Sequence, residues 1–137
     1  MRRLFLSLGL AAISVPATAA VPVNGRWFTA ERDSIIQIGQ CGGVVCGKVA
    51  KVLKAPPGGG AAIDSNNPDP ALRSRPIQGI MLLSGFRDTG KEWEGEIYDP
   101  RRGKTYRSTM AKQADGTLRV KGCVGPFCQS VTFTPAP

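Results

Sequence analysis

Histidine is absent from this sequence, and methionine and cysteine are few. Without an imidazole the chain cannot form a Ser-His-Asp or Cys-His catalytic centre, and it lacks the commonest ligand of transition metals. Met81 and Met110 are too few for a copper-binding methionine cluster, and core filling explains them better. We therefore expect neither a metal nor a cofactor.

Helical periodicity and long apolar runs are missing as well. No window of three turns repeats apolar residues at i, i+3, i+4 and i+7, and 17 glycines and 11 prolines interrupt the chain. The longest apolar run, residues 4–15, is shorter than the ~20 residues that a membrane-spanning helix needs. We therefore expect a protein that is not membrane-spanning.

The N-terminus has the pattern of an export signal. Arg2 and Arg3 precede the apolar run, and Pro16 and the small residues Ala17-Thr18-Ala19-Ala20 follow it. A basic, an apolar and a small-residue region in this order are typical of a secretory signal peptide, and cleavage after Ala19 or after Ala20 fits the pattern. We predict a signal peptide at residues 1–20, a single domain at residues 21–137, and a periplasmic or secreted location.

The predicted domain is moderately basic. Removing Arg2 and Arg3 lowers the formal net charge from +8 to +6. The remaining basic residues are scattered along the chain, whereas a nucleic-acid interface gathers them in one stripe. We therefore expect no nucleic acid partner, and the charge favours attraction to an acidic component of the cell envelope.

The four cysteines form two pairs with equal spacing, Cys41-Gly-Gly-Val-Val-Cys46 and Cys123-Val-Gly-Pro-Phe-Cys128. They allow three disulfide connectivities, and two such pairs could instead form a four-sulfur zinc site. An oxidising compartment argues against zinc, and the Cys-x-x-Cys spacing of redox catalysts is absent. Turn residues inside each pair predict two hairpins, so we favour the local disulfides Cys41–Cys46 and Cys123–Cys128.

Short stretches rich in β-branched and aromatic residues, bounded by turn residues, recur along the predicted domain. Trp93 and Ile97 alternate with three glutamates, which is typical of a strand with one buried face, and we expect a structural role for Trp93. The sequence predicts eight strands: Gly25–Thr29, Ser34–Ile38, Val44–Leu53, Ile77–Phe86, Glu92–Tyr98, Lys104–Met110, Thr117–Lys121 and Gln129–Phe133. Such strands with tight turns predict an all-β fold, either an antiparallel up-and-down barrel or a sandwich.

Two short turns and one long loop connect these strands. The sequences Asp99-Pro100-Arg101-Arg102-Gly103 and Asp115-Gly116 predict hairpin turns. The segment Lys54–Pro76 is a long loop rich in Pro, Gly, Asn and Asp, with one helical turn predicted at Pro70–Arg73. Loops of this length are usually functional or disordered.

Carboxylates in these connections could act as an acid and a base. Asp64 and Asp69 share the long loop, and Asp99 lies beside Tyr98. Capping a turn or pairing with a nearby arginine explains these residues better than catalysis does. We therefore expect structural roles for Asp69 and Asp99 and no catalytic residue.

Several motifs together resemble a known family. Gly25-Arg26-Trp27 is similar to the first-strand motif of lipocalins and other calycins, whose Trp closes the bottom of an eight-stranded barrel. The wider pattern resembles the bacterial exported family called domain of unknown function 2147, on Asp64 and the stretches Gly25–Trp27, Ile36–Cys41, Cys46–Val49, Asn67–Pro76, Trp93–Pro100, Gly103–Tyr106 and Leu118–Cys123. The resemblance implies a secreted, calycin-like up-and-down barrel with Trp27 in a structural role. It implies no established activity.

Three hypotheses for function follow. An eight-stranded barrel can hold one small ligand, so the leading hypothesis is an exported, non-enzymatic binding protein for a small or amphipathic ligand. Its polar rim is predicted at Arg73, Arg75, Tyr98 and Lys104. The alternative is an envelope protein-interaction module with a basic surface and a solid core. The third is a carboxylate-based hydrolase, which needs two acids facing one cleft, ~5–10 Å apart.

Overall fold

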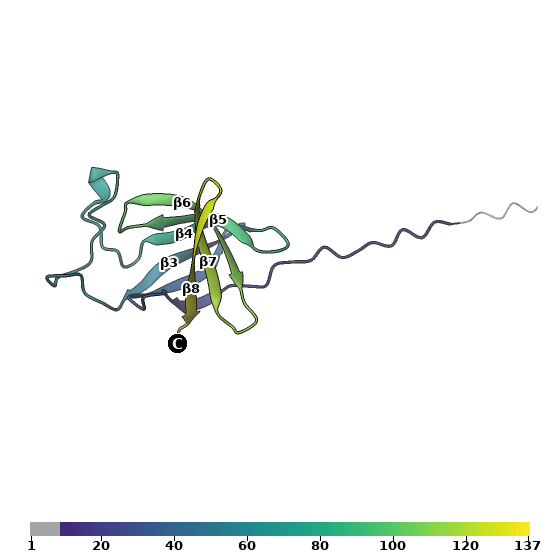
Figure 1. The fold of residues 1–137 in the computed structure, drawn as a ribbon, viewed down its shortest axis with the longest axis horizontal. Helices are drawn as coiled ribbons and strands as arrows, with labels where there is room; N and C mark the ends of the chain where they lie inside the picture. Colours follow the sequence, from purple (N-terminus) through teal and green to yellow (C-terminus); the bar gives the residue numbers. More distant parts are fainter. Residues whose placement is uncertain (1–8) are drawn as a thin grey trace, which may run out of the picture.

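The computed structural model describes residues 9–137. Its strands follow one another around a closed antiparallel barrel, and the last strand pairs with the first (Figure 1). The strands are β1 (Gly25–Phe28), β2 (Ser34–Cys41), β3 (Val44–Val52), β4 (Met81–Asp88), β5 (Trp93–Asp99), β6 (Lys104–Lys112), β7 (Leu118–Val124) and β8 (Phe127–Pro135). The predicted all-β, up-and-down barrel of eight strands is therefore confirmed, and the sandwich is excluded.

The seam that closes the barrel is short. Trp27 of β1 lies opposite Pro135 of β8, Phe28 lies opposite Thr134, and the Ala136 amide donates to the Arg26 carbonyl at 2.9 Å. Pro135 has no amide hydrogen, so the hydrogen bond from Ala136 completes the pairing where proline cannot donate.

The predicted boundaries were wrong at the turn-side ends of several strands. β4 begins at Met81 rather than Ile77, because the Ile80 amide donates to the Ile77 carbonyl and Gly79 turns the chain with a φ of +96°. β2, β7 and β8 are longer than predicted, since they continue to two-residue turns at 42–43 and 125–126. Polar and glycine residues near these turns interrupt the apolar alternation, so the sequence pattern did not indicate where the strands end.

Both predicted disulfides are present, and no cysteine among the described residues is free. Cys123 lies directly opposite Cys128, with their Cα atoms 4.0 Å apart. The other pair is diagonal: Cys46 lies opposite Gly39, and its disulfide partner Cys41 is two residues further along β2, at a Cα–Cα distance of 5.8 Å. The bonds staple the β2–β3 and β7–β8 hairpins.

The up-and-down order gives the barrel two different ends. The short turns at residues 42–43, 89–92 and 113–117 lie at one end, which we call the closed end. The loops at residues 29–33, 53–80, 100–103 and 125–126 lie at the other, which we call the mouth. The long loop projects from the mouth, and the N-terminal segment leaves from the opposite side (Figure 1). The long loop carries the short helical turn η1 (Pro70–Leu72). No helix within residues 9–137 has the length and apolar character needed to cross a membrane.

Large side chains fill the closed end. Trp27, Phe86, Met110 and Leu118 are 4 % exposed or less and belong to one apolar cluster. Val23 joins them from a segment, residues 20–24, that packs on this end and that we call the strap. Burying such side chains contributes about 1.5–3 kcal/mol each, so this half of the barrel carries much of its stability.

The two tryptophans hold the strap in place. The indole nitrogen of Trp27 donates to the Val23 carbonyl at 3.0 Å, and that of Trp93 donates to the Val21 carbonyl at 2.9 Å. The first bond satisfies the buried indole of Trp27 and the second the half-buried indole of Trp93, and together they fix the strap at alternate residues.

Close packing between β4 and β5 predicts an intolerant glycine. A Cβ atom on Gly95 would lie 2.6 Å from the Ser84 carbonyl oxygen and 2.7 Å from the Phe86 ring. We expect Gly95→Ala to lower the free energy of unfolding by about 1–3 kcal/mol, since overpacking forces the neighbours to move. Gly39→Ala is the matched control, because a Cβ there meets nothing within 4 Å. Urea denaturation of the two variants measures the difference, and equal stabilities would contradict this packing.

Candidate functional site

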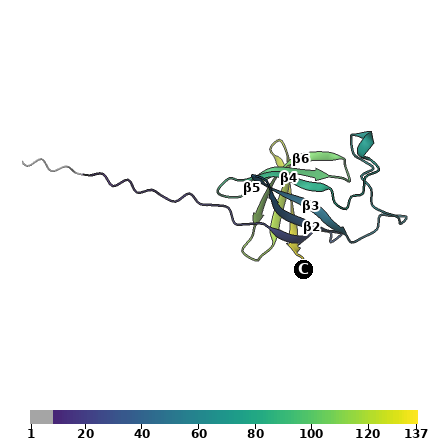
Figure 2. The ribbon, with the colours of Figure 1, turned by 180° about the vertical axis from the view of Figure 1, so that it is seen from behind.

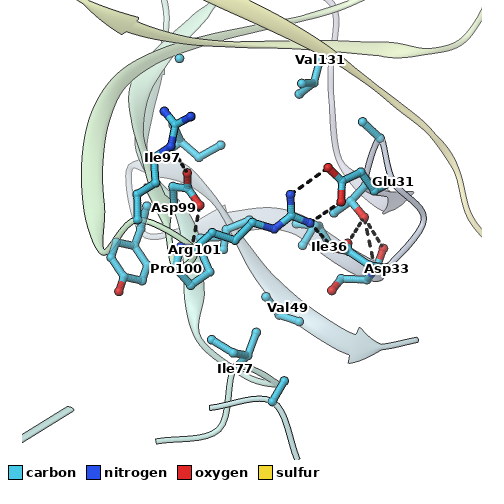
Figure 3. A pocket seen from close by; sticks show the side chains of 18 of the residues that line it. Glu31, Asp33, Ile36, Val49, Ile77, Ile97, Asp99, Pro100, Arg101 and Val131 are labelled. Atoms are coloured by element: carbon cyan, nitrogen blue, oxygen red, sulfur yellow. Dashed lines mark hydrogen bonds and ion pairs between the residues drawn. The ribbon is translucent and has the colours of Figure 1, made fainter. Parts of the chain in front are cut away.

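The mouth half of the barrel is not filled. An open pocket of about 1110 Å³ extends from the barrel interior to the loops of the mouth (Figure 3). Its floor is formed by Ile36, Val49, Val120 and Phe133, which are also members of the buried cluster. Three of these four side chains are β-branched aliphatics, which reach less far across the barrel than the Trp, Phe, Met and Leu residues at the closed end. These aliphatic side chains do not reach across the barrel, and the space above them stays open.

The apolar wall of the pocket continues out of the barrel. Ile97 and Val131 line the middle of the pocket, and Val124 and Phe127 line it at the tip of the β7–β8 hairpin. Val124 and Phe127 lie opposite each other across the hairpin and are 63 % and 80 % exposed. An apolar strip therefore connects the barrel interior with the solvent.

Charged residues border the pocket only at the mouth. They all come from the mouth loops or from the end of a strand next to one: Glu31, Asp33, Lys54, Asp99, Arg101 and Arg102. The site thus combines an apolar interior with a polar rim that carries charges of both signs.

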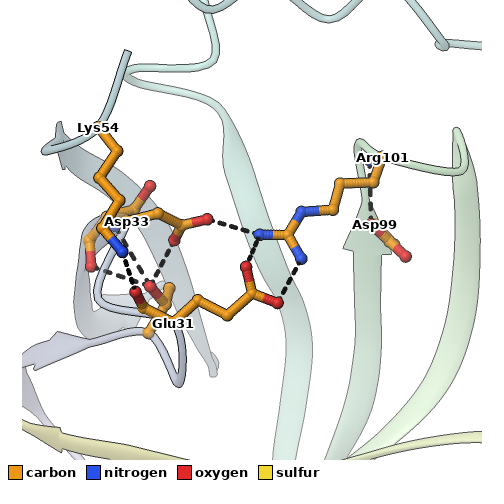
Figure 4. Close-up of polar contacts among 7 residues, drawn as sticks. Glu31, Asp33, Lys54, Asp99 and Arg101 are labelled. Carbon is orange, nitrogen blue, oxygen red and sulfur yellow. Dashed lines mark hydrogen bonds and ion pairs between the residues drawn. The ribbon is translucent and has the colours of Figure 1, made fainter. Parts of the chain in front are cut away.

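One arginine crosses the mouth. Arg101, in the β5–β6 turn, donates to both carboxylate oxygens of Glu31, at 2.8 and 2.5 Å, and to Asp33 at 2.6 Å (Figure 4). Glu31 and Asp33 belong to the β1–β2 loop, four strands away around the barrel. The guanidinium therefore bridges opposite sides of the rim, a contact between residues 70 positions apart in the chain.

Neighbouring groups hold the loops that carry this bridge. The Asp99 carboxylate accepts the Arg101 amide at 3.0 Å, Thr29 donates its hydroxyl to Asp33 at 2.6 Å, and Lys54 donates to the Glu31 carbonyl at 2.7 Å. Hydrogen bonding and charge attraction from Arg101 lower the pKa of Glu31, and the same contacts raise the pKa of Arg101. The bridge therefore stays ionised on both sides at neutral pH.

A second polar cluster anchors the long loop to the barrel. Asp64 is buried, and its carboxylate accepts hydrogen bonds from Tyr98 at 2.6 Å, Asn67 at 2.8 Å and Arg75 at 2.9 Å. Tyr98 belongs to β5, whereas the other two donors belong to the loop itself. Asp64 therefore ties the loop to the barrel wall beside the mouth.

The titration of this cluster follows from its contacts. Burial raises the pKa of Asp64, but the hydrogen bonds from Tyr98, Asn67 and Arg75 outweigh it, and the net pKa is lowered. Burial and the hydrogen bond to Asp64 raise the pKa of Tyr98 to about 12. Asp64 is thus a carboxylate, and Tyr98 its neutral donor, at all physiological pH values.

The loop also rests on the β5–β6 turn. Asn66 donates its side-chain amide to the Arg101 carbonyl at 2.9 Å. Gly103 has a φ of +64°, and a Cβ atom there would collide with the Asn66 carbonyl oxygen. The close approach requires glycine, so the turn that carries Arg101 and the long loop are positioned together.

The four residues predicted to form a polar rim lie in three different settings. Tyr98 borders the pocket and donates to Asp64. Arg75 pairs with Asp64, and Arg73 donates to the Asn67 carbonyl at 2.8 Å, so both hold the long loop together. Lys104 is exposed at the start of β6 and does not border the pocket. A role for these four residues in ligand binding stays a prediction, and the structure brings only Tyr98 to the pocket.

Two carboxylates predicted to be structural lie in turns. Asp69 accepts the Ala71 amide at 3.0 Å and caps η1, which confirms the helical turn predicted in the loop. Asp99 caps the β5–β6 turn through the Arg101 amide. Within residues 9–137, no group of three His, Cys, Asp or Glu side chains is placed to hold a metal ion.

The sequence did not reveal the rim residues Glu31, Asp33 and Arg101. Each lies in a loop whose composition indicates only a turn, and their pairing depends on barrel closure. The one signal for these residues in the sequence was the high density of charge in Asp99-Pro100-Arg101-Arg102-Gly103. Its meaning became clear only when the structure placed the β1–β2 loop opposite this turn.

Comparisons with known proteins agree with this architecture. The family model described as "Uncharacterized protein conserved in bacteria (DUF2147)" matches residues 25–135. The solved structure of protein HP1028 from Helicobacter pylori, described as belonging to the lipocalin family, is similar with a TM-score of 0.73 and 24 % sequence identity, over 86 % of this chain and 85 % of that one. At this identity the likeness shows the fold. No curated protein matches the sequence significantly.

The Asp64 cluster predicts a pH-dependent contribution to stability. We expect Asp64→Asn to lower the free energy of unfolding at pH 7 by about 1.5–3 kcal/mol, since it weakens three hydrogen bonds to a charged acceptor. The folded-state pKa of Asp64 is lowered, so its contribution is present above the unfolded pKa of about 3.9 and is lost as the pH falls through the folded value. The stability gap between wild type and variant should therefore close below about pH 4.

Asp69→Asn is the control for this experiment. Asp69 is an exposed cap in the same loop, and asparagine caps as well as aspartate, so the control should stay within about 0.5 kcal/mol of wild type. Denaturation at pH 7, 5 and 3 measures all three proteins. A gap for Asp64→Asn that is independent of pH would contradict the ionised anchor.

Proposed function

Because the chain belongs to the DUF2147 family of bacterial proteins and folds as a lipocalin-like barrel, we propose that it is an exported protein that binds a small apolar or amphipathic ligand. The observation that carries this proposal is the unequal filling of the barrel, which leaves a pocket of about 1110 Å³ above a packed floor. Ligand pockets for small molecules typically measure ~300–1,000 Å³, and this pocket, which is open at the mouth, is slightly larger, so it has room for one such molecule.

Export to the periplasm or the medium is part of the proposal. It rests on the signal pattern at residues 1–20, of which residues 1–8 lie outside the described part of the chain. The two disulfides support it, because such bonds persist in oxidising compartments.

The pocket lining indicates the chemistry of the ligand. Aliphatic and aromatic side chains surround the interior, and burying apolar ligand surface against them contributes about 25 cal/mol per Å². The charged rim contains both carboxylates and cations, so a polar or zwitterionic head group can be solvated there. An amphipathic molecule with its apolar part inside fits both features.

The carboxylates at the rim favour binding over hydrolysis. A general acid needs a pKa raised toward neutrality. The pKa of Glu31 is lowered instead, and the Arg101 guanidinium occupies both its oxygens and reaches Asp33. The interaction-module alternative expects a solid core, and the open pocket gives the ligand hypothesis more support.

The Arg101 bridge gives the mouth a gate. A ligand that enters between the β1–β2 loop and the β5–β6 turn must pass the guanidinium, which lies across the opening (Figure 3). Arg101 and Glu31 are about 60 % exposed, so water and salt screen the attraction between them. Such a bridge can open and close at small cost, while the buried Asp64 anchor holds the surrounding loop.

Filling the pocket tests the binding function. Val131 lines the pocket and is already 42 % exposed, so a tryptophan there can extend into the empty space without unpacking the core. We expect Val131→Trp to weaken binding of the neutral fluorescent probe N-phenyl-1-naphthylamine at least about tenfold, a loss of about 1.4 kcal/mol. Fluorescence titration of the probe measures the affinity.

The neighbouring residue supplies the control. Thr132 is exposed on the same strand and does not line the pocket, so Thr132→Trp should leave the affinity unchanged. Equal affinities in wild type and Val131→Trp would show that the probe binds elsewhere. The absence of any probe binding to wild type would contradict the proposed function itself.

The gate predicts a change in rates rather than in stability. We expect Arg101→Gln to speed both entry and release of the probe about two- to fivefold, while the free energy of unfolding changes by less than about 1 kcal/mol. Arg102→Gln is the matched control, because Arg102 also borders the pocket but interacts with Asp99, at 4.0 Å, and with Tyr106 on its own side of the mouth and does not bridge it. Stopped-flow fluorescence measures the rates, and identical rates in wild type and Arg101→Gln would rule out a gate.

A further inference from the structure

The strap begins with an unusual contact at the closed end. The backbone amide of Ala20 donates to both carboxylate oxygens of Asp88, at 3.0 and 3.1 Å. Ala20 itself is only 7 % exposed, whereas Asp88 is exposed at the end of β4. One amide hydrogen thus faces a whole carboxylate, which has room for a donor with more hydrogens and a positive charge.

Ala20 is also the first residue of the described chain that the barrel holds. Residues 9–19 are all exposed and lie outside any strand or helix, and the chain runs away from the barrel before this point (Figures 1 and 2). From Ala20 onward the strap is bound by Asp88, then by Trp93 at Val21, then by Trp27 at Val23. Before Ala20 the described chain approaches the barrel at the Thr18 carbonyl, beside Gly90, without a hydrogen bond. Ala20 is therefore the first described residue that is both buried and hydrogen-bonded to the barrel.

The β4–β5 turn is shaped to present this carboxylate. One oxygen of Asp88 also accepts the Gly90 amide at 2.7 Å, which fixes the side chain over the turn. Gly90 has a φ of +87°, and a Cβ atom there would lie 3.0 Å from the Thr18 carbonyl oxygen. The Gly90 amide thus orients the Asp88 carboxylate, and the contact with Thr18 lies in the segment that the cleavage proposed below would remove.

We infer that export processing cleaves the chain between Ala19 and Ala20, and that the α-ammonium group so formed binds the Asp88 carboxylate. This inference rests on the export that is part of the proposed function. Ala17 and Ala19 supply the small residues that a signal peptidase requires at the third and first positions before the cleaved bond. The processed N-terminus is thereby a structural element of the closed end.

The chemistry is a peptide hydrolysis. The bond between the Ala19 carbonyl carbon and the Ala20 nitrogen breaks, and the hydroxyl of water joins the carbonyl carbon to give the Ala19 carboxylic acid. The Ala20 nitrogen takes the proton of that water, and at neutral pH the resulting amine takes another, since the pKa of an α-amino group is ordinarily about 7.7–8.0. The ammonium then offers three donors and a charge where the amide offered one donor.

The structure distinguishes the two cleavage positions that the sequence allows. Cleavage after Ala20 would remove the nitrogen that Asp88 binds and would place the new terminus at Val21, whose carbonyl accepts from Trp93. Asp88 would then lose its partner in the strap. Cleavage after Ala19 keeps every contact of the strap and adds an ion pair.

The first experiment determines the N-terminus of the exported protein. The full chain is expressed with its own signal in a Gram-negative host, and the intact mass of the periplasmic product is measured. A mass that begins at Ala20 is the expected result. A periplasmic product that starts at Val21 or keeps residues 1–19 would overturn this inference but leave export intact, whereas an unprocessed chain that stays in the cytoplasmic fraction would overturn both.

The second experiment tests the ion pair through the reactivity of the α-amino group. Acetylation near pH 7 favours this group over lysine, whose pKa is about 10.4. We expect the α-amino group of exported Asp88→Asn to be acetylated about two- to fivefold faster than that of wild type, the range for losing an exposed ion pair. Asparagine keeps an acceptor for the Gly90 amide, so the turn should persist.

Asp115→Asn is the matched control. Asp115 accepts the Thr117 amide in the β6–β7 turn, as Asp88 accepts the Gly90 amide, but it makes no hydrogen bond to the strap. Its α-amino group should react at the wild-type rate. Equal rates in wild type and Asp88→Asn, or the same acceleration in Asp115→Asn, would overturn the ion pair.

Discussion

The structure depends on how one closed barrel is filled along its axis. Large residues such as Trp27 and Phe86 pack the closed end, and the aliphatic side chains of Ile36, Val49 and Val120 stop short of filling the mouth half. An eight-stranded barrel is just wide enough for its own side chains, so the choice of side-chain size decides between a solid core and a pocket. The strap seals the closed end, and the disulfides staple hairpins on which the walls depend.

The polar groups of the mouth divide into a fixed anchor and an adjustable bridge. Asp64 is buried and has three side-chain donors, so removing any part of the cluster leaves a buried group without its partner. Arg101 is exposed, and its pairs with Glu31 and Asp33 compete with water and salt. The same rim can therefore hold the long loop rigidly while the Arg101 bridge opens to admit a ligand.

Much of the fold could be predicted from local signals, whereas the site could not. Alternation around Trp93, turn residues at Asp115-Gly116 and the paired cysteines report on neighbours in the sequence, and hairpins are made of such neighbours. Barrel closure and the Arg101 bridge join residues far apart in the chain, and no local pattern encodes them. Arg73 and Arg75 have the composition of a binding rim, yet their hydrogen bonds fold the loop onto itself. The pocket depends on the side-chain volumes of all strands together. The sequence does not show which of these side chains face one another inside the barrel.

The proposed function requires that the mouth half of the barrel binds apolar groups. Displacement of N-phenyl-1-naphthylamine by a series of n-alkanols of increasing chain length tests it most directly, because the series varies buried apolar surface alone. We expect the affinity for the alkanols to rise up to about fourfold for each added methylene, the equivalent of about 0.8 kcal/mol, and to stop rising when the pocket is full. Affinity that does not depend on chain length, or no displacement at all, would contradict it.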